Sequence, residues 1–517
     1  MKQGLWRERI LKIAYGILRV AGIGMFLLLT GAAFVSTSYI LPGAEELPVN
    51  KGDNPIFNLL FLGGAFGILF WIRKFLAPMA EKRKNNVEKI LMAVSLLWII
   101  GMGIWWNVSL DRRPEGDQAF IYGAASYFLE GDYSFLAPGG YCQLYPQQLG
   151  LIALMEGLFA IVGKYQYFVF QMICVFMGAG IVFLGRELQK QWKVSLENRI
   201  FYLIMMMGCL PLLFYTSWVY GDVPSIFFAL LAALFLSKFT EHTKWYYGIG
   251  VVVSSVLAVM VRKNSIIFLI AMGIMAVIFA IKNKKAQVLL VVAAVVAASF
   301  LGEQGIYAMY ESRSGQKIEG GLPVSSWIAM GMQEHRGVCG WYNNMPKQVA
   351  EECNWDFKAT ENIVNDIIKQ RMSDFTSNPT YGAGFYGKKI LTQWNAPLYQ
   401  SVYFSAKYEG EAKPASGGLI EGLYETDAGF FGVLGYADGM QFLVYVGMLL
   451  FFVFGLKKEE NPMHYVLLVT IIGGFLFSIL WEAKARYSFP YFIMMYPYAG
   501  LGYAKVLELL KRKKKET

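Results

Sequence analysis

The sequence predicts an all-α, polytopic membrane protein with about twelve transmembrane helices. Apolar residues make up 56% of its 517 residues and charged residues only 16%, well below the roughly one quarter that soluble proteins carry. Apolar runs of roughly 20 residues, the length that crosses a bilayer as a helix, recur along the whole chain. A helix suits such runs because it satisfies its own backbone hydrogen bonds in lipid.

Composition also excludes some classes of function. The formal net charge is +10, but the Lys and Arg residues stand in short clusters between apolar runs, which is typical of cytoplasmic loops. We therefore expect a membrane and no nucleic acid as partner. Five cysteines form no CxxC or metal-ligand spacing. Cys339 and Cys353 could form a disulfide outside the membrane or remain thiols. The apolar run at 11–41 is too long for a cleavable signal peptide.

Residues 1–88 are predicted to form a transmembrane hairpin followed by a basic cytoplasmic loop. The first twelve residues carry four basic side chains, which places the N-terminus in the cytoplasm. Spans are expected at 13–41 and 55–72. The acidic loop between them lies outside, and the basic stretch at 73–89 lies inside.

Residues 89–303 are the predicted transmembrane core. Its first span, 90–108, leads into an external polar loop at 110–164, which we expect to be the catalytic loop. The run 149–162 is apolar but short. If it crossed the membrane, the basic stretch 186–193 would lie outside, against the positive-inside rule. We therefore predict a helix that lies flat on the outer surface. The other spans of this unit then alternate in direction: 165–184, 199–218, 223–236, 246–261, 265–281 and 288–300.

Residues 304–440 are predicted to be a mostly helical external segment that covers the membrane part. Within it, 357–375 shows the apolar spacing of an amphipathic helix. The aromatic and lysine-containing stretch 381–403 suits a helix in the headgroup layer. Residues 441–517 are the predicted C-terminal transmembrane helices and basic tail. Three spans are expected there, 441–456, 464–480 and 489–506, with the tail in the cytoplasm.

The unusual charged residues all fall at the predicted outer ends of spans. Basic residues are rare on that side, so they call for an anionic partner. A lipid phosphate in the outer leaflet, with a carboxylate base beside it, would provide one. The residues concerned are Asp117, Asp222, Arg262, Lys263, Lys484 and Arg486.

Each of these residues also has a purely structural explanation. The two aspartates stand where helices begin, so each could cap a helix. Arg262 and Lys263 could extend to lipid headgroups. Glu482 and Arg486 are four residues apart and could pair on a helix surface. Capping and catalysis are compatible for Asp117, because a helix start can also face a cavity.

Several familiar chemistries have no motif in this chain. The three histidines are scattered, so no histidine-based metal motif exists, and we predict no metal site. Walker and GxGxxG nucleotide motifs are also missing. This points away from a nucleotide-linked substrate and towards a donor that already resides in the membrane.

Four short motifs, in this order and on one predicted side, resemble the GT-C superfamily of integral-membrane glycosyltransferases. The closest resemblance is to glycosyltransferase family 39, the bacterial relatives of protein O-mannosyltransferases and aminoarabinose transferases. The motifs are Gly-Asp-Gln at 116–118 with Gly-Asp-Tyr at 131–133, Tyr-Pro-Gln-Gln-Leu at 145–149, Tyr-Gly-Asp at 220–222 and Arg-Tyr-Ser-Phe-Pro at 486–490. Two positions depart from the family pattern: Gln147 replaces a second proline, and Gln118 replaces a glutamate.

The resemblance implies a hexosyltransferase at the outer face of the cell membrane, with both termini in the cytoplasm. Asp117 would be the catalytic base that deprotonates an acceptor hydroxyl. The donor would be a polyprenyl-phosphate sugar lipid and the acceptor a protein or cell-envelope glycan. The resemblance suggests Asp222 as a second acidic site and leaves room for a divalent cation. The donor phosphate would be bound by the four basic residues named above, Arg262, Lys263, Lys484 and Arg486.

Two other functions fit the sequence less well. A transporter or flippase of lipid-linked sugars should show paired repeats and charges near mid-membrane, whereas the charges here lie at one face. A non-catalytic scaffold would not need clustered external cations.

Overall fold

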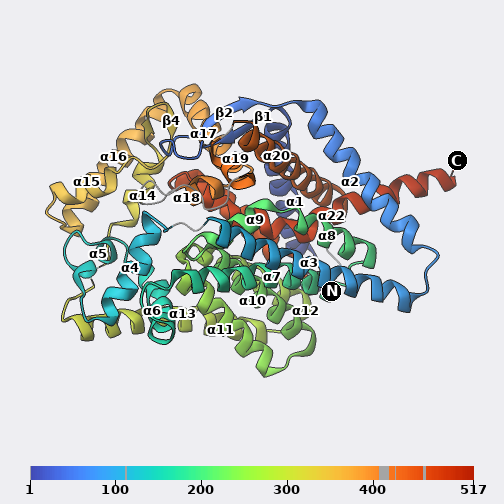
Figure 1. Ribbon diagram of the computed structural model, residues 1–517. Coiled ribbons are helices and arrows are strands. Elements are labelled where there is room, and N and C mark those ends of the chain that lie inside the picture. Colours follow the sequence, from blue (N-terminus) through green and yellow to red (C-terminus); the bar gives the residue numbers. More distant parts are fainter. Residues whose placement is uncertain are drawn as a thin grey trace.

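The computed structural model describes residues 2–110, 113–318, 320–406, 418–425, 427–457 and 461–516. In these ranges the chain is predominantly helical, with helices α1 to α22 and two antiparallel pairs of short strands (Figure 1). Among the described residues, nine helices are long and apolar enough to cross a membrane, or up to eleven if each of two bent helix pairs counts as one span. The prediction of a helical membrane protein is confirmed, apart from the four strands.

Nine of the twelve predicted spans coincide with one of these helices. The other three are helical but differ in kind. The predicted span 199–218 is broken by 55° between α8 and α9, because Pro211 at the start of α9 cannot continue a helix. α11 is only 17 residues long, and α22 contains two prolines. The total of twelve spans stays a prediction.

The bundle comprises α3 (Glu81–Leu110), α7 (Tyr167–Gln191), α8 (Leu196–Met207), α9 (Leu210–Phe214), η3 (Tyr215–Ser217), α10 (Asp222–His242), α11 (Trp245–Val261), η4 (Lys263–Ser265), α12 (Ile266–Asn283), α13 (Gln287–Ser314), α20 (Asp427–Leu450), η5 (Phe451–Gly455), η6 (Pro462–Tyr465), α21 (Val466–Leu480) and α22 (Ala485–Glu516). Its largest interhelical contacts join α10 to α11 and α7, α3 to α7, and α20 to α22.

The N-terminal hairpin differs from the prediction at its outer end. α1 (Lys2–Val35) stops before the predicted end at 41, and β1 (Ser36–Tyr39) pairs with β2 (Val49–Gly52) ahead of α2 (Pro55–Leu76). The β1 sequence Ser-Thr-Ser-Tyr explains the change, since serine and β-branched threonine favour extended backbone over helix.

The loop at 110–164 folds into α4 (Asp117–Leu129), η1 (Ser134–Leu136), α5 (Tyr141–Leu144), η2 (Pro146–Gln148) and α6 (Leu149–Val162). Residues 111 and 112 of this loop lie outside the described residues. The chain turns by 97° between α5 and α6. α6 is fixed to α13 by its buried Glu156, which accepts hydrogen bonds from Tyr310 at 2.7 Å and Arg313 at 2.5 Å. Its flat position on a membrane stays a prediction.

The predicted cover segment forms α14 (Val324–Gly331), β3 (Glu334–His335), β4 (Val338–Cys339), α15 (Met345–Glu352), α16 (Phe357–Ser377), α17 (Pro379–Trp394), α18 (Ser401–Ala406) and α19 (Leu419–Glu425). The predicted amphipathic helix is α16. The boundaries at 303 and 440 fall inside α13 and α20, which run past their apolar stretches. Residues 319, 407–417 and 426 of this segment lie outside the described residues. Cys339 and Cys353 are free thiols.

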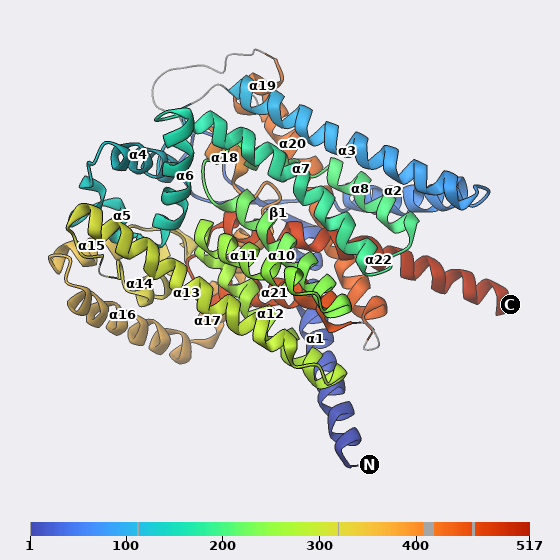
Figure 2. The same cartoon turned by 90° about the horizontal axis from the view of Figure 1, so that it is seen from below.

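The cover segment is joined to α21 and to the loop between α21 and α22. Ala483 N–H donates to Gly340 O at 2.7 Å, and Trp394 Nε1 donates to Ser478 Oγ at 2.8 Å. In both overall views, α4, α5 and α14 to α16 gather at one end of the molecule, away from the C-terminus (Figures 1 and 2).

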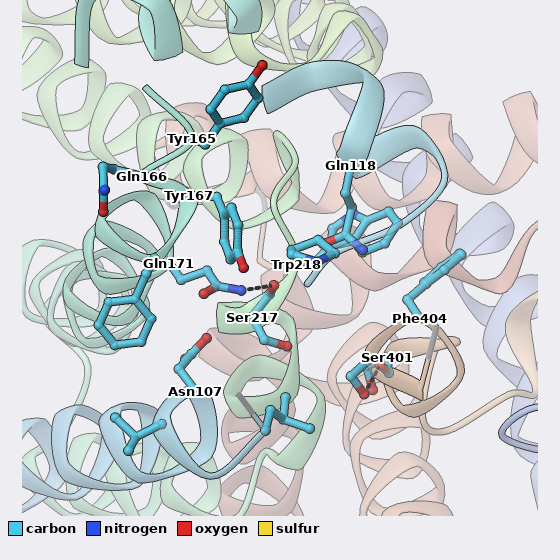
Figure 3. A pocket seen from close by; sticks show the side chains of 15 residues that line it. Asn107, Gln118, Tyr165, Gln166, Tyr167, Gln171, Ser217, Trp218, Ser401 and Phe404 are labelled. Carbon is cyan, nitrogen blue, oxygen red and sulfur yellow. Dashed lines mark hydrogen bonds between the residues drawn. The ribbon is translucent and has the colours of Figure 1, made fainter. Parts of the chain in front are cut away.

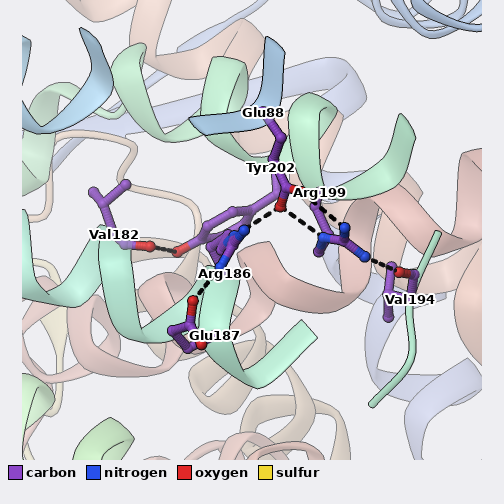
Figure 4. Close-up of polar contacts among 7 residues, drawn as sticks. All are labelled: Glu88, Val182, Arg186, Glu187, Val194, Arg199 and Tyr202. Carbon is purple, nitrogen blue, oxygen red and sulfur yellow. Dashed lines mark hydrogen bonds and ion pairs between the residues drawn. The ribbon is translucent and has the colours of Figure 1, made fainter. Parts of the chain in front are cut away.

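A buried ion cluster joins α3, α7 and α8 (Figure 4). Glu88 is 2% exposed and accepts hydrogen bonds from Arg186 Nε at 2.7 Å and from Arg199 Nε and Nη2 at 2.7 and 2.8 Å. At 1.5 Å per residue, α3 carries Leu110 roughly 33 Å from Glu88. The cluster therefore lies at the far end of α3 from the cavity described next.

Candidate active site

Parts of the chain that are far apart in sequence meet around a cavity of about 290 Å³. It lies at the start of α4 and is closed by α5, the turn before α10, the turn after α11 and the loop before α22. Five of the six charged residues predicted from the sequence line it: Asp117, Arg262, Lys263, Lys484 and Arg486. The other lining residues include Glu46, Glu115, Tyr141, Tyr145, Gln148, Trp218, Tyr220, Tyr342, Phe404, Glu482 and Tyr487.

Asp117 is the first residue of α4 and faces the cavity. Gly116, not Asp117, is the N-cap residue, and its φ of 64° lies in the region that favours glycine. The prediction that Asp117 caps the helix is therefore wrong by one position. The Asp117 side chain is 43% exposed, and its Oδ2 lies 4.0 Å from Arg486 Nη2.

Arg486 sits in a box of aromatic rings. Its guanidinium lies 4.8 Å from the ring centre of Tyr220 and 5.3 to 5.5 Å from those of Trp218, Phe404 and Tyr487. Aromatic faces attract a guanidinium without neutralising it. Its Nε has no hydrogen-bond partner among the described residues. The predicted helix-surface pair with Glu482 does not form, because Glu482 precedes α22 and accepts a hydrogen bond from Tyr487 at 2.9 Å.

Arg262 is paired with Asp222 behind the cavity wall. The Arg262 guanidinium forms an ion pair with the Asp222 carboxylate, whose side chain is 0% exposed. Trp218 Nε1 donates to the other carboxylate oxygen at 3.1 Å. Gly221 makes this contact possible, since a Cβ there would lie 1.9 Å from the Val261 carbonyl oxygen. Asp222 therefore positions Arg262 and does not cap α10, whose N-cap residue is Gly221.

The two lysines have carboxylate partners that the sequence did not reveal. Lys263 Nζ bonds to Glu303 of α13 at 2.6 Å. Lys484 Nζ lies 3.2 Å from Glu46 and 3.8 Å from Glu482. Of the four cations at the wall, Arg486 is thus the one least neutralised by described carboxylates.

The described wall carries four cations and four carboxylates, the latter being Glu46, Glu115, Asp117 and Glu482. Burial raises the pKa of Glu482, against the opposing effects of Lys484 and the Tyr487 hydroxyl.

Tyrosines supply neutral hydrogen-bonding groups around Asp117. Burial, and secondarily the charge of Asp117, raise the pKa values of Tyr141 and Tyr220, so both hydroxyls stay protonated. Gln148 Nε2 donates to Tyr220 Oη at 2.6 Å. No sequence pattern distinguishes these groups, because tyrosine is common throughout this chain.

A second cavity, of about 450 Å³, adjoins the first and shares Trp218 and Phe404 with it (Figure 3). None of its fifteen described lining residues is charged. Amides, hydroxyls and rings point into it, and Gln171 Nε2 donates to Ser217 O at 2.8 Å. Gln118 also accepts a hydrogen bond from Val219 N at 2.8 Å. Gln118 thus supports the wall of the second cavity.

Whether the first cavity binds a divalent cation, for which the resemblance leaves room, is not tested by the structure. In the part of the chain that the structure describes, no three or more His, Cys, Asp and Glu side chains are grouped so that they could hold an ion. At the cavity itself, Glu46 and Glu482 face Lys484, and Asp117 faces Arg486.

Comparisons with known proteins do not assign this chain to a family. No protein-family model matches the chain, and no curated protein sequence matches it. The resemblance to GT-C glycosyltransferases therefore rests on the four sequence motifs alone.

Proposed function

We propose that this protein is an integral-membrane glycosyltransferase that moves a sugar from a polyprenyl-phosphate donor to a protein or cell-envelope glycan. The observation that carries the proposal is the pairing of Asp117 and Arg486. An accessible carboxylate and an incompletely neutralised guanidinium lie 4.0 Å apart at one cavity. Transfer from a sugar phosphate needs such a base and such an anion-binding group.

In the proposed reaction, Asp117 acts as the base and Arg486 binds the leaving phosphate. Asp117 takes the proton of the acceptor hydroxyl, and the oxygen attacks the anomeric carbon of the donor sugar. The bond from that carbon to the phosphate oxygen breaks, and polyprenyl phosphate leaves with the electron pair. Arg486 stabilises the negative charge on the leaving phosphate. Arg262 and Lys484 add positive charge nearby, while Lys263 is held by Glu303.

The neutral cavity supports a carbohydrate substrate. Amide and hydroxyl groups match sugar hydroxyls, and aromatic rings such as Trp218 and Phe404 offer flat apolar faces. A charged phosphate would be poorly accommodated there. The first cavity thus offers a place for the phosphate and the second a place for the sugar. Trp218 and Phe404 line both cavities.

A transporter of lipid-linked sugars is the second candidate. It would share the anionic lipid but would need a path across the membrane, with charged groups near mid-membrane. The ligand-facing charges here stand at helix ends: Asp117 begins α4, Arg262 follows α11, and Arg486 is in the first turn of α22. This placement favours transfer over transport.

The test is to reconstitute the purified protein in vesicles with radiolabelled polyprenyl-phosphate sugars and cell-envelope acceptors. Label appearing on an acceptor, with release of polyprenyl phosphate, is expected. Movement of the donor between leaflets without release of polyprenyl phosphate would support the transporter and refute the proposal.

A further inference from the structure

Four oxygen-bearing side chains meet where the N-terminal hairpin packs against α20. Asp438 of α20 lies beside Asp53, Thr37 and Asn58, which come from the loop before α2, from β1 and from α2. Thr37, Asn58 and Asp438 are 3%, 0% and 4% exposed. None of these residues lines the cavity at Asp117.

One oxygen of each side chain forms no hydrogen bond of ordinary distance and angle, although Asp438 lies within side-chain hydrogen-bonding reach of the other three residues. These atoms are Thr37 Oγ1, Asp53 Oδ2, Asn58 Oδ1 and Asp438 Oδ1, each buried and unpaired among the described residues. The orientation of Asn58 is fixed by its own amide, because Nδ2 donates to Ala33 O at 3.0 Å. Its oxygen therefore faces away from Ala33. Buried polar atoms without partners are uncommon, and four together call for a ligand.

The chemistry of the set defines the ligand. Asp53 and Asp438 would repel each other if both were charged with nothing between them. A shared proton could bridge the two carboxylates, but it would leave the Asn58 oxygen without a donor. An ion could bind to all four oxygens. Oxygen-only ligand sets favour hard cations, and two carboxylates balance a divalent charge.

We propose that Thr37, Asp53, Asn58 and Asp438 bind a hard divalent cation such as Ca²⁺, which fastens the β1–β2 hairpin and α2 to α20. Backbone carbonyls or water would complete its coordination shell. The nearest other charge acting on Asp53 is Lys51, whose Nζ lies 4.4 Å from the ring centre of Phe431.

The site would position part of the candidate active site from a distance. The loop between β1 and β2 carries Glu46, which contacts Lys484, and Ser38 N–H of β1 donates to Asn395 O at 2.8 Å. Its role is structural, and it does not depend on the proposed glycosyltransferase activity.

The test uses the full-length protein in detergent micelles after treatment with a chelator. Thermal unfolding is followed by tryptophan fluorescence with CaCl₂, MgCl₂ or NaCl at matched ionic strength. Ca²⁺ is expected to raise the wild-type Tm saturably, because a ligand bound only by the folded state stabilises it. Asp438→Asn and Asp53→Asn should lose this shift. Asp366→Asn, which removes an exposed carboxylate on α16, should keep it.

An unchanged wild-type Tm in Ca²⁺ and Mg²⁺ would overturn the proposal, as would an equal shift in Asp438→Asn. A pair of carboxylates that only shares a proton would give the first of these results. If the aspartate variants do not fold, Tb³⁺ luminescence of the wild type and of Thr37→Val replaces them. Tb³⁺ that Ca²⁺ displaces from the wild type, and that binds more weakly to Thr37→Val, is expected; equal binding to both would also overturn the proposal.

Discussion

Arg486 shows how one side chain can be both buried and available. It is 4% exposed, yet its nearest described carboxylate is Asp117 at 4.0 Å. The surrounding rings compensate part of the cost of removing the charge from water. A close ion pair would have neutralised the guanidinium more fully, as Asp222 does for Arg262.

Replacing Arg486 by lysine should lower kcat/KM for the lipid-linked donor by about 10- to 100-fold. Lysine keeps the charge but loses the planar fork and the stacking on the rings, which make the two residues poor substitutes. Steady-state transfer at varied donor concentration measures the effect.

Lys263→Met is the matched comparison, since Lys263 lines the same cavity but is held by Glu303. Its kcat/KM should change by less than about threefold, within what a partly exposed ion pair contributes. A larger loss for Lys263→Met than for Arg486→Lys would contradict the assignment of the phosphate to Arg486.

The sequence predicted the cations of the cavity because basic residues at outer helix ends conflict with the positive-inside rule. It could not predict their partners. Glu46 and Glu303 lie far away in sequence, and acidic residues outside the membrane are ordinary. The ion pair between Asp222 and Arg262 depends on Gly221 packing against Val261, a tertiary contact that no local pattern encodes.

Among the helices, the Glu88 cluster makes a sharp energetic prediction. Glu88→Ala would leave the guanidinium groups of Arg186 and Arg199 largely buried without this carboxylate, at a cost of about 3–5 kcal/mol in the free energy of unfolding. Urea or thermal unfolding in micelles measures it. Glu81→Ala removes a 79% exposed partner of Lys84 at the start of the same helix, and should cost no more than about 1 kcal/mol. Similar values for both variants would contradict the cluster's role.

Lys389 of α17 should make stability depend on pH. It is 0% exposed, donates to Gly331 O at 2.6 Å and Ile479 O at 2.9 Å, and burial lowers its pKa from 10.5 to about 7. Below pH 7 the folded protein bears the full cost of the buried charge. Between about pH 7 and 10.5 the unfolded chain binds the extra proton, so stability should rise with pH.

Lys389→Met should flatten this rise, and Lys388→Met, at the exposed neighbouring position, should leave it intact. Unfolding midpoints at several pH values between 6.5 and 9, roughly the range around the folded pKa, decide the matter. An identical slope in wild type and Lys389→Met would show that another group is responsible.

Apolar runs predicted where helices lie but not always where they end. The predicted first span extended to 41, past the end of α1 at Val35, because the uncharged residues of β1 do not interrupt an apolar run. The pairing of β1 with β2 could not be seen from composition. α13 continues to Ser314 through a polar sequence, which an apolar-run criterion excludes. The break at Pro211 was readable in principle, since proline interrupts helices.

At the scale of the whole molecule, the two ends of the bundle differ in chemistry. At one end lie α4, α5 and α14 to α16, and at the other lies the C-terminus (Figure 2). The cavity lies at the start of α4, and the Glu88 cluster lies towards the start of α3. The sidedness predicted from charge, in which the cavity faces out of the cell, stays a prediction. The helical, multi-span character of the chain could be predicted from apolar length, whereas the contacts that join the cover segment to the bundle, such as the hydrogen bond from Trp394 to Ser478, could not.

Single cysteines introduced at the two ends should react differently in intact cells. Lys369→Cys, on exposed α16, should be labelled by a membrane-impermeant maleimide, and Lys244→Cys, between α10 and α11, only after permeabilisation. Cys353→Ser in the background removes the one native thiol that is not buried. Reversed labelling would overturn the predicted orientation.

The most direct measurement of the central claim is single-turnover transfer from a labelled polyprenyl-phosphate sugar by wild type, Asp117→Asn and Glu130→Gln. Glu130 ends the same helix and pairs with Lys164 at the surface, so it controls for loss of an unrelated carboxylate. Glu130→Gln should match the wild type, and Asp117→Asn should bind the donor but transfer about 10²- to 10⁴-fold more slowly. Transfer at the wild-type rate by Asp117→Asn would contradict the account.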